Sequence, residues 1–339
     1  MKKINTHTEA RKGMLQRPRF WTATQGEEMI ISDHIKITRP DHWFKNVFVL
    51  PGIFLALLVD RSIPGIPEVL TIFYGLFIVC LSASANYVMN ELMDAETDKH
   101  HPTKKDRPIP SGRVKKSSAI LIWIILMCLS LFLASTVNKY FLMITVIFLL
   151  QGLLYNIPPI RTKDLPYLDV ISESVNNPIR LLLGWFMIIT VSFPTLSLIL
   201  AYWMIGAFFM ASKRYAEFVM INDQRRAAAY RNSFGHYSKN KLLISMFYFA
   251  CLFSFFMGIF LIRYRIELIF AIPNIALVVA YYLRMSLMPN SPVQAPELLY
   301  KNRLFVGILF SCLAVIVLFF FVDVPFIREL FAPVASYYP

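Results

Sequence analysis

The sequence has little of what marks a soluble, disulfide-bonded or zinc-binding protein. Charged residues make up only 16% of the 339 residues, against 57% hydrophobic residues, and this balance is too apolar for a soluble domain of this length. The four cysteines are scattered through apolar runs without metal-type spacing, so we interpret them as small buried hydrophobic residues. They are Cys80, Cys128, Cys251 and Cys312.

The sequence also shows no signs of a signal peptide, a flexible linker or an internal repeat. The first 35 residues contain no apolar signal core, which argues against a cleaved secretion signal. No Gly/Ser-rich linker and no repeat of solenoid length divides the chain. We therefore expect a polar, disordered arm over 1–37, one membrane domain over 38–322 and a short tail over 323–339.

Long apolar runs, by contrast, are abundant. A transmembrane helix needs roughly 20 mostly apolar residues to cross about 30 Å of hydrocarbon. The sequence predicts an all-α, polytopic bundle of nine spans, of which the first and sixth are short. The predicted spans are 47–60, 68–89, 118–137, 140–157, 168–192, 196–212, 242–262, 266–288 and 304–322.

The charge balance indicates an orientation. Lys and Arg total 34 against 21 Asp and Glu, for a formal net charge of +13, and most of these cations fall in the N-terminal segment and in alternate loops. Because cations accumulate in cytoplasmic loops, we predict a cytoplasmic N-terminus. Cations spread over five loops do not make a nucleic-acid surface, so we expect no nucleic-acid partner.

The first candidate motif, NELMDAETDKHHPTKKDRPIPSG, directly follows the second apolar run. Its residues Asn90, Asp94 and Asp98 are four apart and so lie on one face of a helix. An ionised Asp near bilayer depth costs about 2.5–3.5 kcal/mol, so a cation should balance them. Mg²⁺ suits hard oxygen ligands and is usually bound by one or two carboxylates together with substrate phosphates. This face is therefore a candidate Mg²⁺ site, and its two aspartates are candidate catalytic residues.

Cations follow this acidic face closely. Lys104 and Arg107 lie in the same motif and would contact an anionic substrate. An alternative is that the acidic residues form a solvated helix end that pairs with the lysines after it. In that case the segment would have no ligand.

A second polar segment, SKRYAEFVMINDQRRAAAYRNSF, begins at the end of the sixth predicted span. Lys213, Arg214 and Glu217 fall within about one turn, and Tyr230 and Arg231 lie on what we predict to be a short cytoplasmic helix. Cations that face the acidic helix end would neutralise charge developing on a diphosphate leaving group. The alternative is ordinary positive-inside loop charge.

Ionisable residues also occur inside predicted spans, where they are functional candidates by default. The fifth span carries Asp169, Glu173 and Arg180, and we predict that Arg180 binds substrate. A structural Asp169–Arg180 or Glu173–Arg180 pair is the alternative. Lys45, at the entry to the first span, would reach the same substrate site as Arg180. The alternative is that its side chain extends toward the membrane surface and anchors the span in lipid.

Taken together, the nine spans and these two motifs resemble the UbiA superfamily of intramembrane prenyltransferases over residues 38–322. RPDHWFKNV, the first motif and above all SKRYAEF are similar to its branch of polyprenyl-phosphate phosphoribosyltransferases. The resemblance implies Mg²⁺-dependent transfer of 5-phosphoribose from phosphoribosyl pyrophosphate to a polyprenyl phosphate. It also implies that the first motif binds magnesium and diphosphate, and that Lys213, Arg214, Tyr215 and Glu217 line the donor pocket.

The resemblance further implies a plasma-membrane protein whose active site faces the cytoplasm and whose product feeds cell-wall or other glycolipid synthesis. Its partners would be the two substrates and membrane lipids, with a homo-oligomer left open. Other superfamily members carry a second aspartate-rich motif where this chain has KRYAE, which favours the phosphoribosyl donor. The nearest alternative is a prenyltransferase acting on an aromatic acceptor. A transporter is disfavoured because the charged residues crowd one membrane face and no inverted repeat is evident.

Overall fold

The computed structural model describes residues 31–60, 63–99, 104–294 and 296–331, and every regular element in these ranges is helical. Eight helical segments of the described chain are long and apolar enough to cross a membrane, as expected of a multi-pass membrane protein. The prediction of an all-α fold is confirmed, but eight segments rather than nine meet the length. They are Ile31–Asp60, Ile66–Asp98, Lys116–Ser135, Lys139–Asn156, Leu196–Ile221, Lys239–Tyr264, Ile266–Ser286 and Arg303–Phe321.

The elements follow one another along the chain without a strand in the described ranges. The α-helices are α2 (Leu50–Asp60), α3 (Ile66–Asp98), α4 (Lys116–Ser135), α5 (Lys139–Asn156), α6 (Leu168–Ser174), α7 (Asn176–Phe186), α8 (Leu196–Ile221), α9 (Gln224–Tyr230), α10 (Lys239–Tyr264), α11 (Ile272–Ser286), α12 (Arg303–Phe321) and α13 (Pro325–Leu330). The 3₁₀ helices are η1 (Pro40–Val49), η2 (Lys104–Asp106), η3 (Thr162–Asp164), η4 (Asn232–His236), η5 (Ile266–Ala271), η6 (Pro292–Gln294) and η7 (Pro296–Lys301).

The predicted fifth span, 168–192, is the one that differs most. It is divided at Val175 into α6 and α7, which have 7 and 11 residues and are each too short to span a bilayer. Pro178 explains the break, because a proline ring clashes with the carbonyl group four residues earlier, here that of Ser174. The polar residues of this segment therefore lie on two short helices joined by a bend.

Helix α8 is longer than the predicted sixth span, which ended at residue 212. It runs without interruption to Ile221, so Lys213, Arg214 and Glu217 lie on a membrane helix and not in a loop as we predicted. The short helix predicted after the sixth span is present as α9. Of the predicted terminal segments, 1–30 and 332–339 lie outside the described residues, whereas 31–36 are helical and Ile37 is fully buried.

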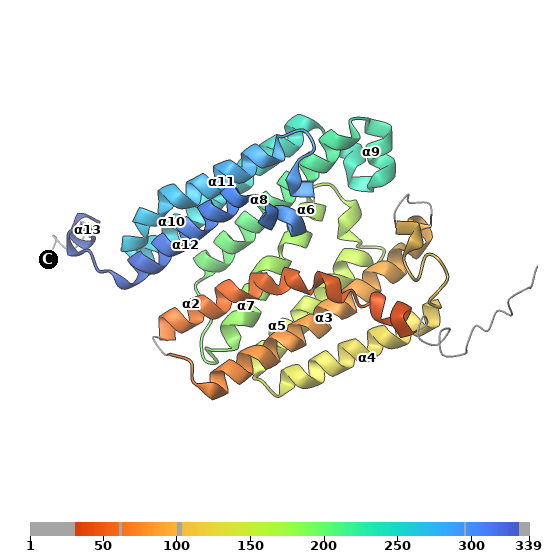
Figure 1. Cartoon of the computed structure of the whole chain (residues 1–339), viewed down its shortest axis with the longest axis horizontal. Coiled ribbons are helices and arrows are strands. Elements are labelled where there is room, and N and C mark those ends of the chain that lie inside the picture. Colours follow the sequence, from red (N-terminus) through yellow and green to blue (C-terminus); the bar gives the residue numbers. More distant parts are fainter. Residues whose placement is uncertain (1–30, 61–62, 100–103, 295, 332–339) are drawn as a thin grey trace, which may run out of the picture.

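The long helices form two groups, each with its own apolar core (Figure 1). One core lies among α2, α3, α5 and α7 and includes Ile53, Ile78 and Phe148. The other lies among α8, α10, α11 and α12 and includes Phe208 and Met246. The polar segments described below lie along the boundary between these groups.

Close approach of α2 to α7 depends on two glycines. A Cβ atom on Gly52 would lie 2.0 Å from the Leu181 carbonyl oxygen, and one on Gly184 would lie 2.2 Å from the Val49 carbonyl oxygen. No larger side chain fits at such a contact. This packing sets η1, which precedes α2, directly against α7.

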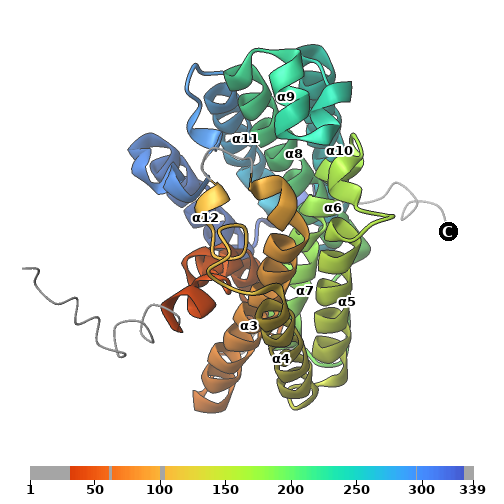
Figure 2. The same ribbon diagram turned by 90° about the vertical axis from the view of Figure 1, so that its right-hand side faces the viewer.

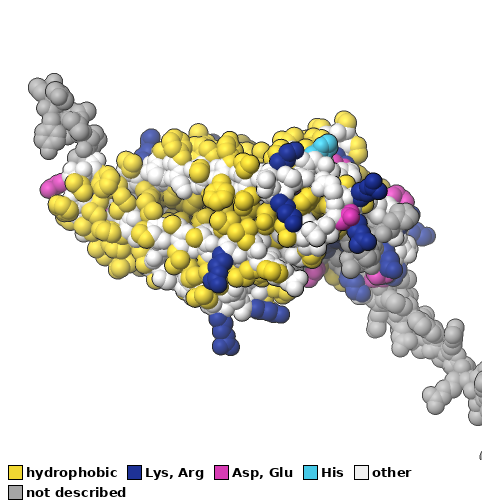
Figure 3. Space-filling view, turned by 90° about the horizontal axis from the view of Figure 1, so that it is seen from above, with side chains coloured by type: hydrophobic (Ala, Val, Ile, Leu, Met, Phe, Trp, Pro, Cys, Tyr) yellow, Lys and Arg dark blue, Asp and Glu magenta, His cyan; other side chains and the backbone are white. Residues whose placement is uncertain are grey.

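Both polar motifs lie at one end of the molecule. The C-terminal end of α3 and helix α9 are at the same end in Figure 1, opposite α13. Viewed from that end, α6 and α9 both lie against α8 (Figure 2). The Lys and Arg side chains visible in Figure 3 gather mainly there, while the rest of that face is largely hydrophobic. The two motifs therefore lie at the same end of the helical bundle.

Candidate active site

The carboxylates of the first motif lie on the last turns of α3, and each is held by cations. Asp94 Oδ1 accepts hydrogen bonds from Arg161 Nη2 at 3.0 Å and Lys163 Nζ at 2.5 Å. Asp98 Oδ2 accepts one from Arg107 Nη1 at 2.5 Å, and Lys104 Nζ lies 3.9 Å from Asp98 Oδ1. The acidic face is therefore enclosed by cations and is not an exposed helix end.

Three of the groups around this face were missed by the sequence analysis. Asn156 Oδ1 accepts hydrogen bonds from Asn90 Nδ2 at 2.7 Å and from Lys163 Nζ at 2.9 Å, and Arg161 completes the set. All three belong to the end of α5 and the segment after it. The available signal was the pair of cations in IRTKD directly after a membrane helix, which we counted only as positive-inside charge.

Glu91, on the same helix, has a different role from Asp94 and Asp98. Its side chain is 1% exposed, accepts a hydrogen bond from the Ile109 backbone N–H at 3.1 Å and pairs with Arg39 Nη2 at 3.3 Å. These contacts tie the loop after α3 and the residue before η1 to the C-terminal part of α3. Glu91 is a structural residue and not a metal ligand candidate.

We expect Glu91→Ala to lower the melting temperature of the detergent-solubilised protein, because it leaves a buried N–H group without an acceptor. The expected loss is about 1–3 kcal/mol of stability. Glu91→Gln is the matched control, since its amide oxygen still accepts the Ile109 bond, and it should lose less. An unchanged melting temperature in the alanine variant would contradict this role.

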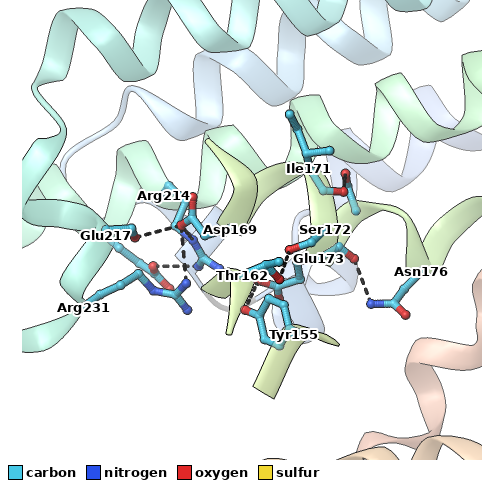
Figure 4. Close-up of polar contacts among 12 residues, drawn as sticks. Tyr155, Thr162, Asp169, Ile171, Ser172, Glu173, Asn176, Arg214, Glu217 and Arg231 are labelled. Atoms are coloured by element: carbon cyan, nitrogen blue, oxygen red, sulfur yellow. Dashed lines mark hydrogen bonds and ion pairs between the residues drawn. The ribbon is translucent and has the colours of Figure 1, made fainter. Parts of the chain in front are cut away.

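The second motif is centred on Arg214, which points from α8 toward α6 (Figure 4). Its guanidinium group is 2% exposed and pairs with Asp169 Oδ2 at 3.3 Å, with Glu217 Oε2 at 3.1 Å and with Glu173. The predicted alternative that Asp169 or Glu173 pairs with Arg180 is therefore wrong. The break at Val175 places the two acids beside α8 instead.

Asp169 joins the polypeptide after α8 to α6. Its fully buried carboxylate accepts hydrogen bonds from Ser233 Oγ at 3.0 Å and Tyr237 OH at 2.7 Å, and Arg231 Nη1 lies 3.4 Å away. Burial, and then the charge of Asp169, raise the pKa of the Tyr237 hydroxyl, which therefore stays protonated as a donor. Arg231 and its neighbours are held over α6 by these bonds.

The two motifs meet across the site. Lys104 Nζ, after α3, lies 5.8 Å from the centre of the Tyr230 ring on α9, a cation–π geometry. Burial lowers the pKa of Lys104, against the opposing charges of Asp98 and Asp94, and burial likewise lowers the pKa of Lys163, against Asp94. Cations deprived of water in this way gain from an added anion.

Other predicted residues lie at the edges of this polar region. Lys213 lies near enough to Glu173 for the two charges to interact, and Lys45 Nζ lies 5.9 Å from the centre of the Tyr87 ring. Tyr215 is partly buried and packs against the apolar clusters of α8 and its neighbours.

Arg180 lies deeper, on α7, and is 9% exposed. Its Nε donates to Asn46 Oδ1 at 3.2 Å, and its guanidinium carbon lies 5.1 Å from the centre of the Phe148 ring. The structure thus places this cation within the bundle, apart from the carboxylates of α6.

The donor set of α3 fits Mg²⁺ only in combination with a substrate. Among the described residues, no group of three or more His, Cys, Asp or Glu side chains is placed to hold a metal. Asp94 and Asp98 are one turn apart and supply two carboxylates whose charges both act on Lys104. Two carboxylates with substrate phosphates are an arrangement that Mg²⁺ commonly uses, so these residues suit a metal that arrives with a phosphorylated ligand.

Comparison with known proteins identifies relatives of this chain. The chain is 29% identical over 220 residues to decaprenyl-phosphate phosphoribosyltransferase of Mycobacterium tuberculosis, covering 65% of this chain and 70% of that protein. It is 30% identical over 227 residues to the Corynebacterium glutamicum protein of the same name, covering 61% and 60%. Its fold matches a UbiA homologue from Archaeoglobus fulgidus bound to GPP and Mg²⁺, with a TM-score of 0.60 at 20% identity over 84% of this chain and 99% of that one. Residues 47–306 match the family model of the UbiA prenyltransferases, and the chain belongs to the UbiA prenyltransferase family.

Proposed function

We propose that this protein transfers 5-phosphoribose from phosphoribosyl pyrophosphate to a polyprenyl phosphate in a Mg²⁺-dependent reaction. The products are polyprenyl-phosphoryl-5-phosphoribose and pyrophosphate. The observation that carries the proposal is that Arg214 pairs with all three acids of the second motif and α6, which are Asp169, Glu173 and Glu217. They are ill suited to bind the second metal that an aspartate-rich motif would hold, and the names of the two relatives described above point to the same donor and acceptor.

The α3 face would hold the diphosphate. In this proposal Asn90, Asp94 and Asp98 bind Mg²⁺ with the diphosphate oxygens, and the metal when bound supplies a positive charge that stabilises the leaving group. Lys104 and Arg107 lie beside Asp98 and would neutralise charge that remains on the pyrophosphate as it departs.

The α8 side would hold the rest of the donor. Lys213, Tyr230 and Arg231 are proposed to contact it, with Lys104 connecting the two sides through its contact with Tyr230. Arg214 and Glu217 are held in a buried ion-pair cluster, so we propose that they position the donor-binding residues of α8 and α9. Lys45 and Arg180 are proposed to contact the lipid acceptor.

The chemistry needs little from a general base. Loss of pyrophosphate from the anomeric carbon develops positive charge on the sugar, and the acceptor phosphate is already an anion that can attack it. Holding the two reactants in line and stabilising the leaving group then account for the catalysis. Because the site lies at the end of the molecule where cations gather, we propose that it faces the cytoplasm of a plasma-membrane protein with a cytoplasmic N-terminus.

A transfer assay tests the proposal. Purified protein in detergent is incubated with a polyprenyl phosphate, Mg²⁺ and phosphoribosyl pyrophosphate labelled in the ribose, with and without chelator. We expect label in the lipid phase only when Mg²⁺ is present. Transfer that continues unchanged in chelator would contradict the metal requirement.

The second candidate is prenyl transfer to an aromatic acceptor, which the GPP-bound structural relative favours. The same preparation is therefore given a prenyl diphosphate and an aromatic acid. Prenylated product, without any labelled phosphoribosyl lipid, would overturn the proposed donor. It would leave the family assignment unaffected.

A further inference from the structure

Arg180 is a buried cation whose contacts include no carboxylate. Its partners among the described residues are Asn46 Oδ1 at 3.2 Å, the Asn176 carbonyl oxygen at 3.5 Å and the face of Phe148 at 5.1 Å. The titratable side chains close enough to interact with it are Tyr87, Tyr202 and Cys80, and all three are ordinarily neutral. Its positive charge is therefore not balanced by these contacts.

Every other arginine or lysine at the core of the site has an acid close by. Arg214 has three carboxylates within 4 Å, and each of the four cations that surround the α3 acids has at least one. Those four are Lys104, Arg107, Arg161 and Lys163. A charge at membrane depth costs about 2.5–3.5 kcal/mol even on insertion scales, so an uncompensated one indicates an anion that is supplied by a ligand.

The Arg180 side chain is also held in place. Asn46, which is 5% exposed, accepts the Arg180 Nε–H bond and donates its own amide to Cys80 Sγ at 3.2 Å. Asn46 lies on η1 and Arg180 on α7, and the close contact of Gly184 with Val49 holds these two helices together. A guanidinium group has five N–H donors in a rigid fork, and this arrangement uses one of them firmly, so most of the fork is available to a phosphate.

The depth of Arg180 distinguishes between the two substrates. Tyr87, which lies near Arg180, precedes Asp94 on α3 by seven residues, which corresponds to about 10 Å along a helix axis. The diphosphate of a water-soluble donor would be bound at the carboxylate level, nearer the cytoplasmic end. A phosphate that reaches Arg180 is more readily one attached to an isoprenoid chain that extends into the hydrocarbon.

We propose that Arg180, oriented by Asn46, binds the phosphate group of the lipid acceptor and so selects a polyprenyl phosphate over the corresponding alcohol. This inference rests on the proposed function, because it assumes a phosphorylated lipid acceptor. It assigns the donor to the α3 and α8 residues and the acceptor phosphate to α7. The two substrates would thus be bound by separate sets of cations.

The test measures binding without turnover. Full-length wild-type, Arg180→Gln and Arg180→Lys proteins in detergent are titrated with farnesyl phosphate, with farnesol and, separately, with phosphoribosyl pyrophosphate. We expect Arg180→Gln to weaken farnesyl phosphate binding by about 10- to 100-fold and to leave binding of the other two ligands unchanged. Arg180→Lys, which keeps the charge but not the fork, should lie between the two.

Some results would overturn the inference. Equal weakening for farnesol would show that Arg180 acts only through packing, and weakened donor binding with intact farnesyl phosphate binding would place the donor there. Because the assay requires no transfer, a wild-type protein that binds farnesyl phosphate through Arg180 yet transfers no phosphoribose would contradict the proposed donor alone. If Arg180→Gln does not elute as a monodisperse species, Arg180→Lys and Asn46→Ala carry the comparison, with the same selective loss expected and its absence overturning the inference.

Discussion

Asp94→Asn and Asp98→Asn should each reduce transferase activity by about 100-fold or more while leaving the protein folded. An amide of the same size can keep one hydrogen bond to the surrounding cations, whereas it removes the negative charge that Mg²⁺ requires. Both carboxylates lie on one face of α3 and are held by cations that a bound diphosphate would also contact. Initial rates in the labelled transfer assay, together with gel filtration of each variant, measure the effect.

Glu96→Gln is the matched control for both variants. Glu96 lies on the same helix turn between them, but its side chain is 65% exposed and pairs with Lys99 and Lys116 on the outside. We expect near wild-type activity, because surface ion pairs contribute little. Wild-type rates in both aspartate variants would remove the metal site from the proposed function, and an equal loss in Glu96→Gln would show a non-specific effect of charge.

Arg214→Leu should be the most destabilising single substitution in the site. It would leave Asp169, Glu173 and Glu217 close together without their shared cation, and removal of one partner from a buried ion pair costs about 3–5 kcal/mol. We expect a clearly lower melting temperature in detergent and loss of activity, because the substitution removes the ion pairs between α6 and α8. Differential scanning fluorimetry of purified variants measures the first effect.

Arg225→Leu provides the comparison, since Arg225 is an exposed arginine on α9. It should leave the melting temperature within the range of ordinary surface substitutions. If Arg214→Leu were as stable as Arg225→Leu and only inactive, Arg214 would act on substrate directly and not as a positioning residue.

Local sequence patterns predicted most of the helices because their signals are short-ranged. Apolar runs of membrane length identified the eight long helical segments, although three of these segments extend 9 to 16 residues beyond the predicted bounds. The four-residue spacing of Asn90, Asp94 and Asp98 placed them on one helix face. The exception was the fifth span, where composition suggested one helix although Pro178 divides it. A proline signal was present, but the apolar content of the segment outweighed it.

The partners of the charged residues were beyond the reach of such patterns. Asp94 is paired with Arg161 and Lys163, which lie 67 and 69 positions further along the chain, and no spacing rule connects them. The alternative that Arg180 pairs with Asp169 or Glu173 failed for the same reason, because it considered only residues of one predicted span.

By itself, the sequence determined the class of protein, the positions of the apolar helices and the two polar motifs, because apolar length and helical periodicity are properties of neighbouring residues. Only the tertiary structure decided which charged side chains pair with one another. Arg214 was brought to the acids of α6 by the break at Val175 and the length of α8, and Arg180 was left with Asn46 and Phe148. Ion pairing in a bundle depends on the distances between packed helices, and these are set by contacts such as that of Gly52 with α7 rather than by order along the chain.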